Sequence, residues 1–271
     1  MYDTVAGTWT HSAAMDFPLV PGQTYHYAVA DGPASLLPYG NVLVMASPVR
    51  NGSPFNTPSH FYEFDGINLM QVADTPNAAS FTSFQGRMLL LPSGQVLLTG
   101  TQDVLLYSNG GSPQNAWRPV ITSAPSTVTA GNTYAISGRL FNGFSEGATY
   151  GDDAAMSSNY PLVRIKNLAT SHVVYARTHD HTSMGVELVS SRAVVSTQFD
   201  VPTGIEAGRS ELVVVVNGIS SLPITVNENV ADNTPAPKDK DECKKGGWQI
   251  FQFPRKFKNQ GDCIQFVNTG K

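Results

Sequence analysis

The chain has 271 residues, of which 41% are hydrophobic and only 14% are charged. It can therefore bury one large or two ordinary cores, and it is not a disordered chain. Its 24 glycines and 18 prolines favour short strands with many turns over helices. The net charge is −4, and no window approaches the ~20 apolar residues needed to cross a bilayer. The composition predicts an all-β globular protein without a transmembrane segment.

Charge is distributed unevenly along the chain. Residues 1–228 carry nine Lys or Arg against sixteen acids, whereas residues 229–271 carry eight against five. The acidic body and the lack of a recognised motif argue against nucleic-acid binding. The basic tail fits solubilising lysines, or contact with an acidic wall polymer or membrane surface.

Residues 1–118 contain an internal repeat with a period of about 50 residues. The segment ASLLPYGNVLVMAS (34–47) matches RMLLLPSGQVLLTG (87–100). Each copy predicts a hairpin in which a Pro-x-Gly turn joins two strands. Both strands are apolar on both faces, as strands buried between stacked sheets must be.

An aromatic-led strand follows each copy, in HFYEFDGINLMQVAD (60–74) and in VLLYSNGGSPQNAW (104–117). The opening YDTVAGTWT (2–10) is the same element from an earlier unit. This Tyr, turn, Trp pattern resembles kelch repeats, which form the blades of β-propellers. The match is partial, because Leu-Leu-Pro-x-Gly stands in place of the kelch diglycine. About two blades are too few for a propeller, so we expect upstream blades to be missing; association of the blades with partners is the alternative.

Residues 119–227 predict a β-sandwich. In VVYART (173–178) alternate side chains should point to opposite faces, and the β-branched run 213–216 stops at Asn217-Gly218, which is turn chemistry. The strings SGRLFNGFSEGATYGDD, NYPLVRIKN, RTHDHTSMGVE and IEAGRSELVVVVNGISS resemble the immunoglobulin-like (E-set) domain that follows a kelch propeller in galactose oxidase-like and glyoxal oxidase-like proteins. The bacterial kelch-containing members are the most similar. The resemblance covers residues 1 to about 227.

Oxidases of this family hold copper with two histidines and two tyrosines, one of them cross-linked to a cysteine. No cysteine lies between Met1 and Glu242, so these residues cannot supply the cross-link. The family's Tyr-His pair should stand where this chain has FTSFQG (81–86), and Tyr25-His26 lies too far before Pro38. The resemblance therefore implies no catalytic or cofactor-binding residue here. A fragment of a copper-radical oxidase of sugars or aldehydes, with its catalytic blades upstream, remains the alternative.

Two loops of the sandwich are candidates for metal binding. The resemblance places a copper histidine near His179, and on an extended backbone His181 would point the same way, so that both could share a divalent metal such as copper. A loop packed on the propeller explains both histidines equally well. In the loop 145–160, Glu146, Asp152 and Asp153 offer oxygens that suit calcium, although such loops are commonly just solvated.

The C-terminal region predicts a linker, residues 228–242, and a small module, residues 243–271. Cys243 and Cys263 are the two cysteines of the chain and predict one disulfide formed in an oxidising compartment. A bridge of that loop size contributes about 3 kcal/mol. The module resembles a short C-terminal unit of secreted bacterial proteins. We expect an extracellular or cell-surface protein, although MYDTVAGTWTH is not a signal peptide.

These observations favour a non-catalytic binding or cell-surface interaction protein. Carbohydrate is the candidate ligand, because secreted propellers and sandwiches bind glycans by stacking them on Tyr and Trp. Trp9 and Trp117 stand at blade-end positions, where a tryptophan ordinarily packs as part of the structure.

Overall fold

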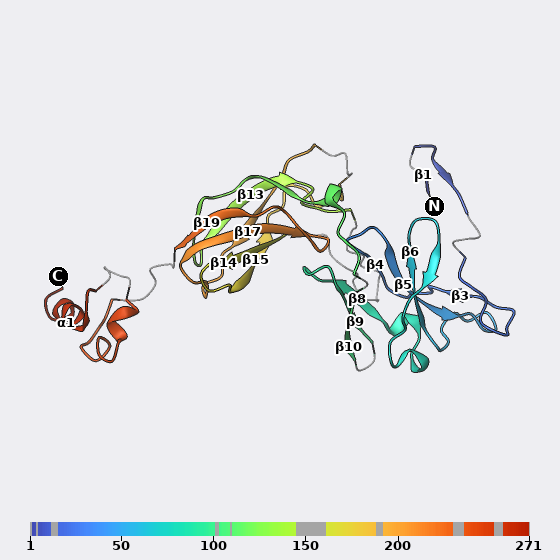
Figure 1. Cartoon of the computed structure of the whole chain (residues 1–271), viewed down its shortest axis with the longest axis horizontal. Coiled ribbons are helices and arrows are strands. Elements are labelled where there is room, and N and C mark those ends of the chain that lie inside the picture. Colours follow the sequence, from blue (N-terminus) through green and yellow to red (C-terminus); the bar gives the residue numbers. More distant parts are fainter. Residues whose placement is uncertain are drawn as a thin grey trace.

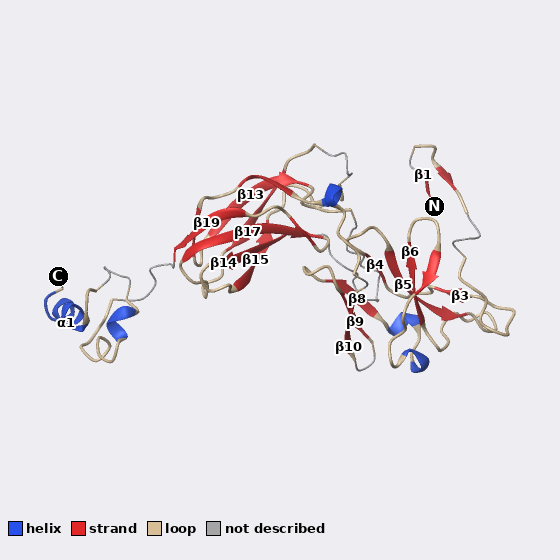
Figure 2. Cartoon of the chain, in the orientation of Figure 1, coloured by secondary structure: helices blue, strands red, loops and turns tan. Residues whose placement is uncertain are grey.

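The structure is a computed structural model that describes residues 2–3, 5–11, 16–100, 103–108, 110–144, 161–187, 192–229, 236–251 and 257–270. Strands dominate these residues, and the α-helix α1 (Gln260–Thr269) lies near the C-terminus (Figures 1 and 2). The all-β prediction is thus confirmed for the body of the chain. No helix in the described ranges is long and apolar enough to span a bilayer.

Two small antiparallel sheets form the N-terminal part. The first sheet has the order β3-β5-β6-β7, with β4 paired to β5; its strands are β3 (Tyr27–Ala28), β4 (Ala34–Leu36), β5 (Val42–Pro48), β6 (His60–Phe64) and β7 (Leu69–Gln71). The second sheet has the order β10-β9-β8; its strands are β8 (Arg87–Leu90), β9 (Val96–Thr99) and β10 (Val104–Tyr107). Each sheet contains one copy of the sequence repeat.

Both copies of the repeat fold as the predicted hairpins, β4–β5 and β8–β9. The Leu37 amide donates to the Asn41 carbonyl at 2.8 Å, and the Leu91 amide donates to Gln95 in the same way at 2.8 Å. The turn glycines have positive φ, 106° at Gly40 and 83° at Gly94, a region that favours glycine. The Pro-x-Gly spacing that the two copies share therefore reflects the same backbone conformation in both turns.

The two sheets stack face to face. Apolar side chains from both fill a shared core, made of Leu37, Leu43, Met45, Phe61, Ala78, Phe81, Met88, Leu90, Val96 and Leu98. The opposite face of the first sheet is covered by residues 17–27, whose Val20 and Tyr27 pack with Ala46 and Tyr62. The first sheet is thus buried on both faces, as its apolar sequence predicts.

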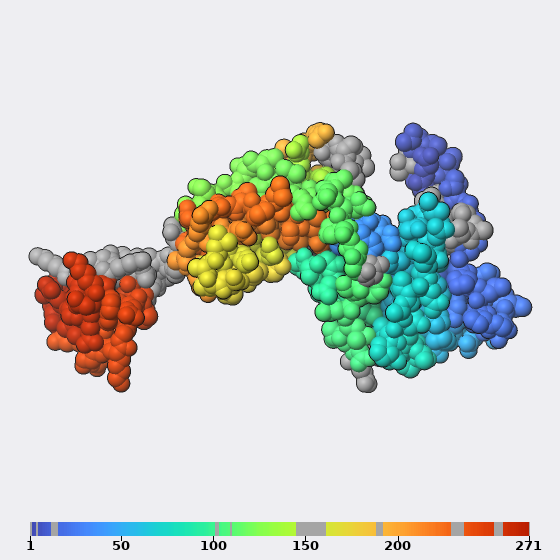
Figure 3. Space-filling view, viewed as in Figure 1, coloured from blue at the N-terminus to red at the C-terminus, as the bar shows by residue number. Residues whose placement is uncertain are grey.

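The N-terminal hairpin joins β1 (Tyr2–Asp3) to β2 (Thr8–Trp9). Asp3 accepts the amides of Val5 and Ala6 at 2.8 and 3.0 Å. In the β6–β7 turn Asp65 likewise accepts the amides two and three positions after it, those of Ile67 and Asn68. The predicted likeness between residues 2–10 and 60–74 therefore extends to the turn. The hairpin projects from the rest of the chain in Figure 3, and Trp9 is exposed.

The central part is a nine-stranded sheet with the order β11-β13-β16-β15-β14-β17-β19-β12, with β18 paired to β17. It curls around a single core to which strands from both ends of this order contribute (Figure 1). Its strands are β11 (Val120–Ser123), β12 (Thr127–Thr129), β13 (Thr133–Arg139), β14 (Leu162–Asn167), β15 (Val173–His179), β16 (Val195–Asp200), β17 (Gly208–Val216), β18 (Ile219–Ser220) and β19 (Ile224–Asn229). These strands occupy the region in which the sequence predicts a sandwich, and the curled sheet is called the sandwich below.

Strand β15 connects the two halves of the curled sheet. Its first half, up to Ala176, pairs with β14, and its second half, from Arg177, pairs with β16. The predicted alternation is confirmed, because Ala176 is buried while its neighbour Tyr175 is exposed. The predicted turn at Asn217-Gly218 is also confirmed, with φ of 46° and 72° between β17 and β18.

The sandwich contacts the N-terminal sheets directly. The Arg118 guanidinium donates to the Ser220 carbonyl at 2.5 Å, and the rings of Trp117 and Phe144 lie 5.1 Å apart. The β17–β18 turn meets the β8–β9 turn so closely that a Cβ on Gly218 would lie 2.6 Å from the Gly94 Cα. Two turns can meet at this distance only where both carry glycine.

The C-terminal module is closed by the predicted disulfide, Cys243–Cys263. Both cysteines are buried with Phe251 and Phe257. Asn259 caps α1 by accepting the Asp262 amide at 2.9 Å. The helix was not expected from the sequence. The predicted linker is shorter than residues 228–242, because β19 continues to Asn229 and Pro237 is already buried.

A test of the close contact between the turns is Gly218→Ala. Gly22 has nearly the same φ, 73° against 72°, but has no atom within 4 Å of its Cβ position. Gly22→Ala therefore reports the backbone strain alone, about 1–2 kcal/mol. We expect Gly218→Ala to lower the unfolding free energy by at least about 1 kcal/mol more than Gly22→Ala, measured by calorimetry. Equal losses would show that the contact adds nothing.

A second test concerns Glu228, a buried carboxyl of β19 whose oxygens have no hydrogen-bond partner among the described residues. Burial raises the pKa of Glu228 above 4.5, and the neighbouring Ser210 hydroxyl opposes this shift only in part. Stability linked to this group is present below pH 4.5 and is lost as the pH rises through the folded-state pKa. Glu228→Gln should therefore raise stability at pH 7 by about 1 kcal/mol or more and have little effect at pH 4. Calorimetry at both pH values measures this, with Glu211→Gln as control; identical pH profiles for wild type and variant would contradict it.

Candidate functional site

A groove opens where β15 leaves one half of the curled sheet and joins the other. It encloses about 640 Å³ and is lined by Leu162, Tyr175, Ala176, Arg177, Thr178, His179, Asp180, His181 and Met184. The groove lies at the change of strand partner at residues 176–177, where pairing of β15 with β14 ends and pairing with β16 begins. Both histidines singled out in the sequence line this groove.

His179 holds two carboxylates. Its Nε2 lies 3.0 Å from Asp200 Oδ1, and its Nδ1 lies 3.0 Å from Asp180 Oδ2. The hydrogen bond to Asp200, followed by that to Asp180, raises the pKa of His179. Thr133 Oγ1 donates to Asp200 at 2.6 Å, and this bond together with His179 lowers the pKa of Asp200. Below its pKa, His179 is therefore a cation between two anions.

The two histidines do not continue along one extended strand. β15 ends at His179, and Asp180 has a φ of 52°, a left-handed conformation that Asp tolerates better than most residues. Desolvation, followed by the charge of His179, lowers the pKa of His181. The expectation of an extended backbone is thus wrong. No group of three or more His, Cys, Asp or Glu is arranged to hold a metal within the described ranges, and metal binding at His179 and His181 stays a prediction.

The predicted calcium ligands Glu146, Asp152 and Asp153 lie outside the described residues. Tyr25-His26 has local partners, since His26 Nδ1 lies 2.7 Å from the Phe17 carbonyl. Trp117 packs on Phe144 as expected. Trp9 does not pack into a core, and its ring lies 5.1 Å from that of Tyr2 in the exposed hairpin.

Tyr175 supplies an aromatic surface to the groove. It lies on the outer side of β15 and is 45% exposed, because the following residue, Ala176, takes the inward position. Arg177 and Asp180 add a planar donor and a charged acceptor to the same groove. The groove therefore combines an open ring face with hydrogen-bonding groups.

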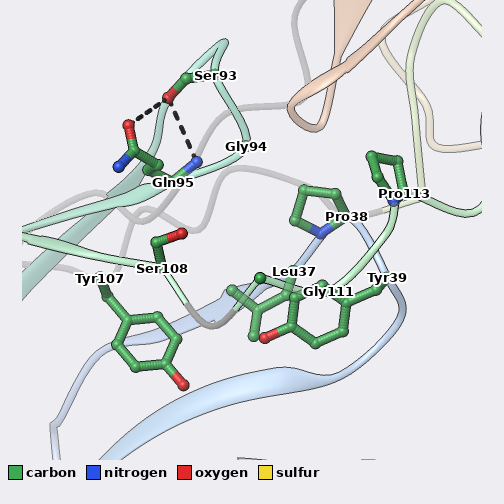
Figure 4. Close-up of a pocket in the computed structure, with 11 residues that line it drawn as sticks. Leu37, Pro38, Tyr39, Ser93, Gly94, Gln95, Tyr107, Ser108, Gly111 and Pro113 are labelled. Carbon is green, nitrogen blue, oxygen red and sulfur yellow. Dashed lines mark hydrogen bonds between the residues drawn. The ribbon is translucent and has the colours of Figure 1, made fainter.

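A smaller cavity of about 150 Å³ lies between the two repeated turns (Figure 4). It is lined by Leu37, Pro38, Tyr39, Ser93, Gly94, Gln95, Tyr107, Ser108, Gly110, Gly111 and Pro113. Figure 4 shows Tyr107 and Ser108 on one side and Tyr39, beside Leu37, on the other. At about 30 Å³ per water, this cavity has room for about five waters.

Both tyrosines of this cavity donate to one buried carboxylate, that of Glu63. Tyr39 donates to Oε1 at 2.6 Å, Tyr107 donates to the same oxygen, and Asn41 Nδ2 donates to Oε2 at 2.8 Å. Burial and the hydrogen bond to Glu63 raise the pKa of Tyr39, so its phenol stays a donor. Sequence reasoning missed this cluster. The feature that could have revealed it is Glu63, an acidic residue two positions after Phe61 and therefore on the same inward face of β6.

No family model and no curated protein matches this chain. Among solved structures, the chain is similar to "Crystal structure of the Lin-41 filamin domain", with 11% identity over 41% of this chain and 91% of that chain. The TM-score is 0.22, which is too low to carry an inference.

The charge pair in the groove can be tested by NMR titration of the His179 imidazole. Because Asp200 is the main cause of the raised pKa of His179, Asp200→Asn should lower that pKa, and Asp180→Asn should lower it less. Stabilisation from this contact is complete below the unfolded pKa of 6.5 and is lost as the pH rises through the folded value. An unchanged midpoint in Asp200→Asn would refute the assignment.

Proposed function

We propose that this chain is a non-catalytic extracellular binding protein whose sandwich recognises carbohydrate in the groove beside Tyr175. The observation that carries the proposal is the exposed Tyr175 ring in a groove that also contains Arg177 and Asp180. A pyranose ring has an apolar C–H face, which stacks on an aromatic ring, and an edge of hydroxyl groups, which need donors and acceptors. The groove provides both kinds of contact.

The carboxylates near the groove support binding over glycoside hydrolysis. Hydrolysis uses a carboxylic acid of raised pKa together with a second carboxylate. Hydrogen bonds from Thr133 and His179 instead lower the pKa of Asp200. Asp200 is therefore held as an anion, and it suits accepting hydrogen bonds better than donating a proton.

We further infer that residues 1–118 are partial kelch-type blades and that residues 119–227 are an immunoglobulin-like domain of the galactose oxidase type. The stacked hairpins and the curled sheet around one core support this inference. The Cys243–Cys263 disulfide is compatible with an extracellular location. Binding of cell-surface or extracellular glycans fits these assignments.

The binding proposal is tested by Tyr175→Ala. The chain is screened against soluble polysaccharides by affinity electrophoresis, and the Kd of a retained one is measured by calorimetry. Losing ring stacking should weaken binding roughly tenfold. Val173→Ala is the matched control, because Val173 lies on the same side of the same strand, is 38% exposed against 45% for Tyr175, and does not line the groove.

Two results would contradict the proposal. One is a failure of the binding assay to single out Tyr175, either because no polysaccharide is retained or because Val173→Ala weakens binding as much as Tyr175→Ala. The other is release of peroxide when sugars or aldehydes are added to the copper-loaded chain, which would favour an oxidase.

A further inference from the structure

The second N-terminal sheet ends in an apolar edge strand. β10 pairs with β9 on one side and stands at the end of its sheet. Its Val104 and Leu106 are exposed. Edge strands are commonly protected by Lys, Pro, a bulge or a covering segment, and VLLY (104–107) contains no Lys or Pro. Such an edge is a template for pairing with another strand.

The first copy of the repeat indicates which kind of strand could pair with the outer edge of β10. β6 pairs with β5 as β10 pairs with β9, since Val42 lies opposite Phe64 and Val96 lies opposite Tyr107. In the first sheet the outer edge of β6 is paired with β7, antiparallel, with Phe64 opposite Leu69 and Tyr62 opposite Gln71. The corresponding edge of the second sheet has no such strand among the described residues.

An apolar pocket opens beside this edge, between β10 and the segment 73–76. It encloses about 210 Å³ and is lined by Leu43, Phe61, Ala73, Asp74, Thr75, Pro76, Met88, Leu98, Leu105, Leu106 and Tyr107. Its inner wall is the buried core shared by the two sheets. At about 30 Å³ per water, the pocket has room for one aliphatic or aromatic side chain.

Acidic groups flank the same place. Asp74 lines the pocket and is held by His60 Nδ1 at 2.6 Å and by the Phe61 amide at 3.2 Å. Asp103, next to β10, accepts from Asn77 Nδ2. This rim favours a partner with a basic residue beside its apolar one.

We propose that β10 binds an extended strand of a partner polypeptide, paired antiparallel to its outer edge. One apolar side chain of that strand enters the pocket, and a basic residue lies near Asp74. Main-chain hydrogen bonds supply affinity in this mode of recognition, and the pocket supplies specificity. The site is separate from the groove beside Tyr175, so it stands or falls independently of carbohydrate binding.

The test uses the full chain and a synthetic peptide with the sequence of the first sheet's own outer strand, GINLMQVA (66–73), with one Lys added at its C-terminus as the basic residue. We expect saturable binding with a Kd of about 1 mM or tighter, together with slowed amide hydrogen exchange in Val104–Tyr107. The same peptide with Pro in place of Met70 should not bind, because it lacks one main-chain donor. Absence of binding, or binding without protection of β10, overturns the proposal.

Two matched variants locate the site. Leu106→Lys changes a pocket residue that is 57% exposed, and Leu89→Lys changes a residue of the same sheet that is 43% exposed and does not line the pocket. Leu106→Lys should weaken peptide binding at least about tenfold, whereas Leu89→Lys should leave it unchanged. Equal weakening refutes the site. A dimer of this chain that Leu106→Lys dissociates would make the occupant a second copy and overturn the assignment to a partner.

Discussion

The arrangement of the N-terminal part depends on the buried carboxylate of Glu63. A carboxylate removed from water is costly unless several donors surround it. Here the donors Tyr39 and Asn41 come from the first repeated turn, and Tyr107 comes from β10 in the other sheet. The need to satisfy one anion therefore fixes the first turn against both sheets. The bond from Tyr107 also ties β10 to β6, beside the cavity of Figure 4 and the apolar pocket at the edge of the second sheet.

The two copies of the repeat have the same backbone but different surroundings. The first turn has Gly40 close to the Trp117 ring, and its Pro38 also lies near Gly218 of the sandwich. The second turn, at Gly94, faces the sandwich and touches Gly218. The two turns therefore share one backbone conformation but make different contacts, because Gly40 lies against Trp117 and Gly94 lies against Gly218. The contact between turns leaves no space for side chains, which is why it consists of glycine and proline.

The features that the sequence predicted correctly depend mostly on residues that lie close together in the chain. The two hairpins, the turn at Asn217, the alternation along β15 and the disulfide all follow from spacings of a few residues or from a cysteine count. The groove beside Tyr175 and the donors around Glu63 were not predictable, because they depend on which distant strands become neighbours. The expectation of an extended backbone from His179 to His181 failed at one residue. Asp180 adopts a left-handed conformation, and nothing in the surrounding sequence requires it.

The three tryptophans of the chain are divided among its three structural regions. Trp9 is exposed on the N-terminal hairpin, Trp117 contacts Phe144 at the start of the sandwich, and Trp248 packs against the disulfide-closed core. Their indole rings therefore differ in exposure to water, since Trp9 is exposed whereas Trp117 and Trp248 are partly buried. Intrinsic fluorescence of variants that each retain one tryptophan would follow the melting of each region separately, without an attached dye.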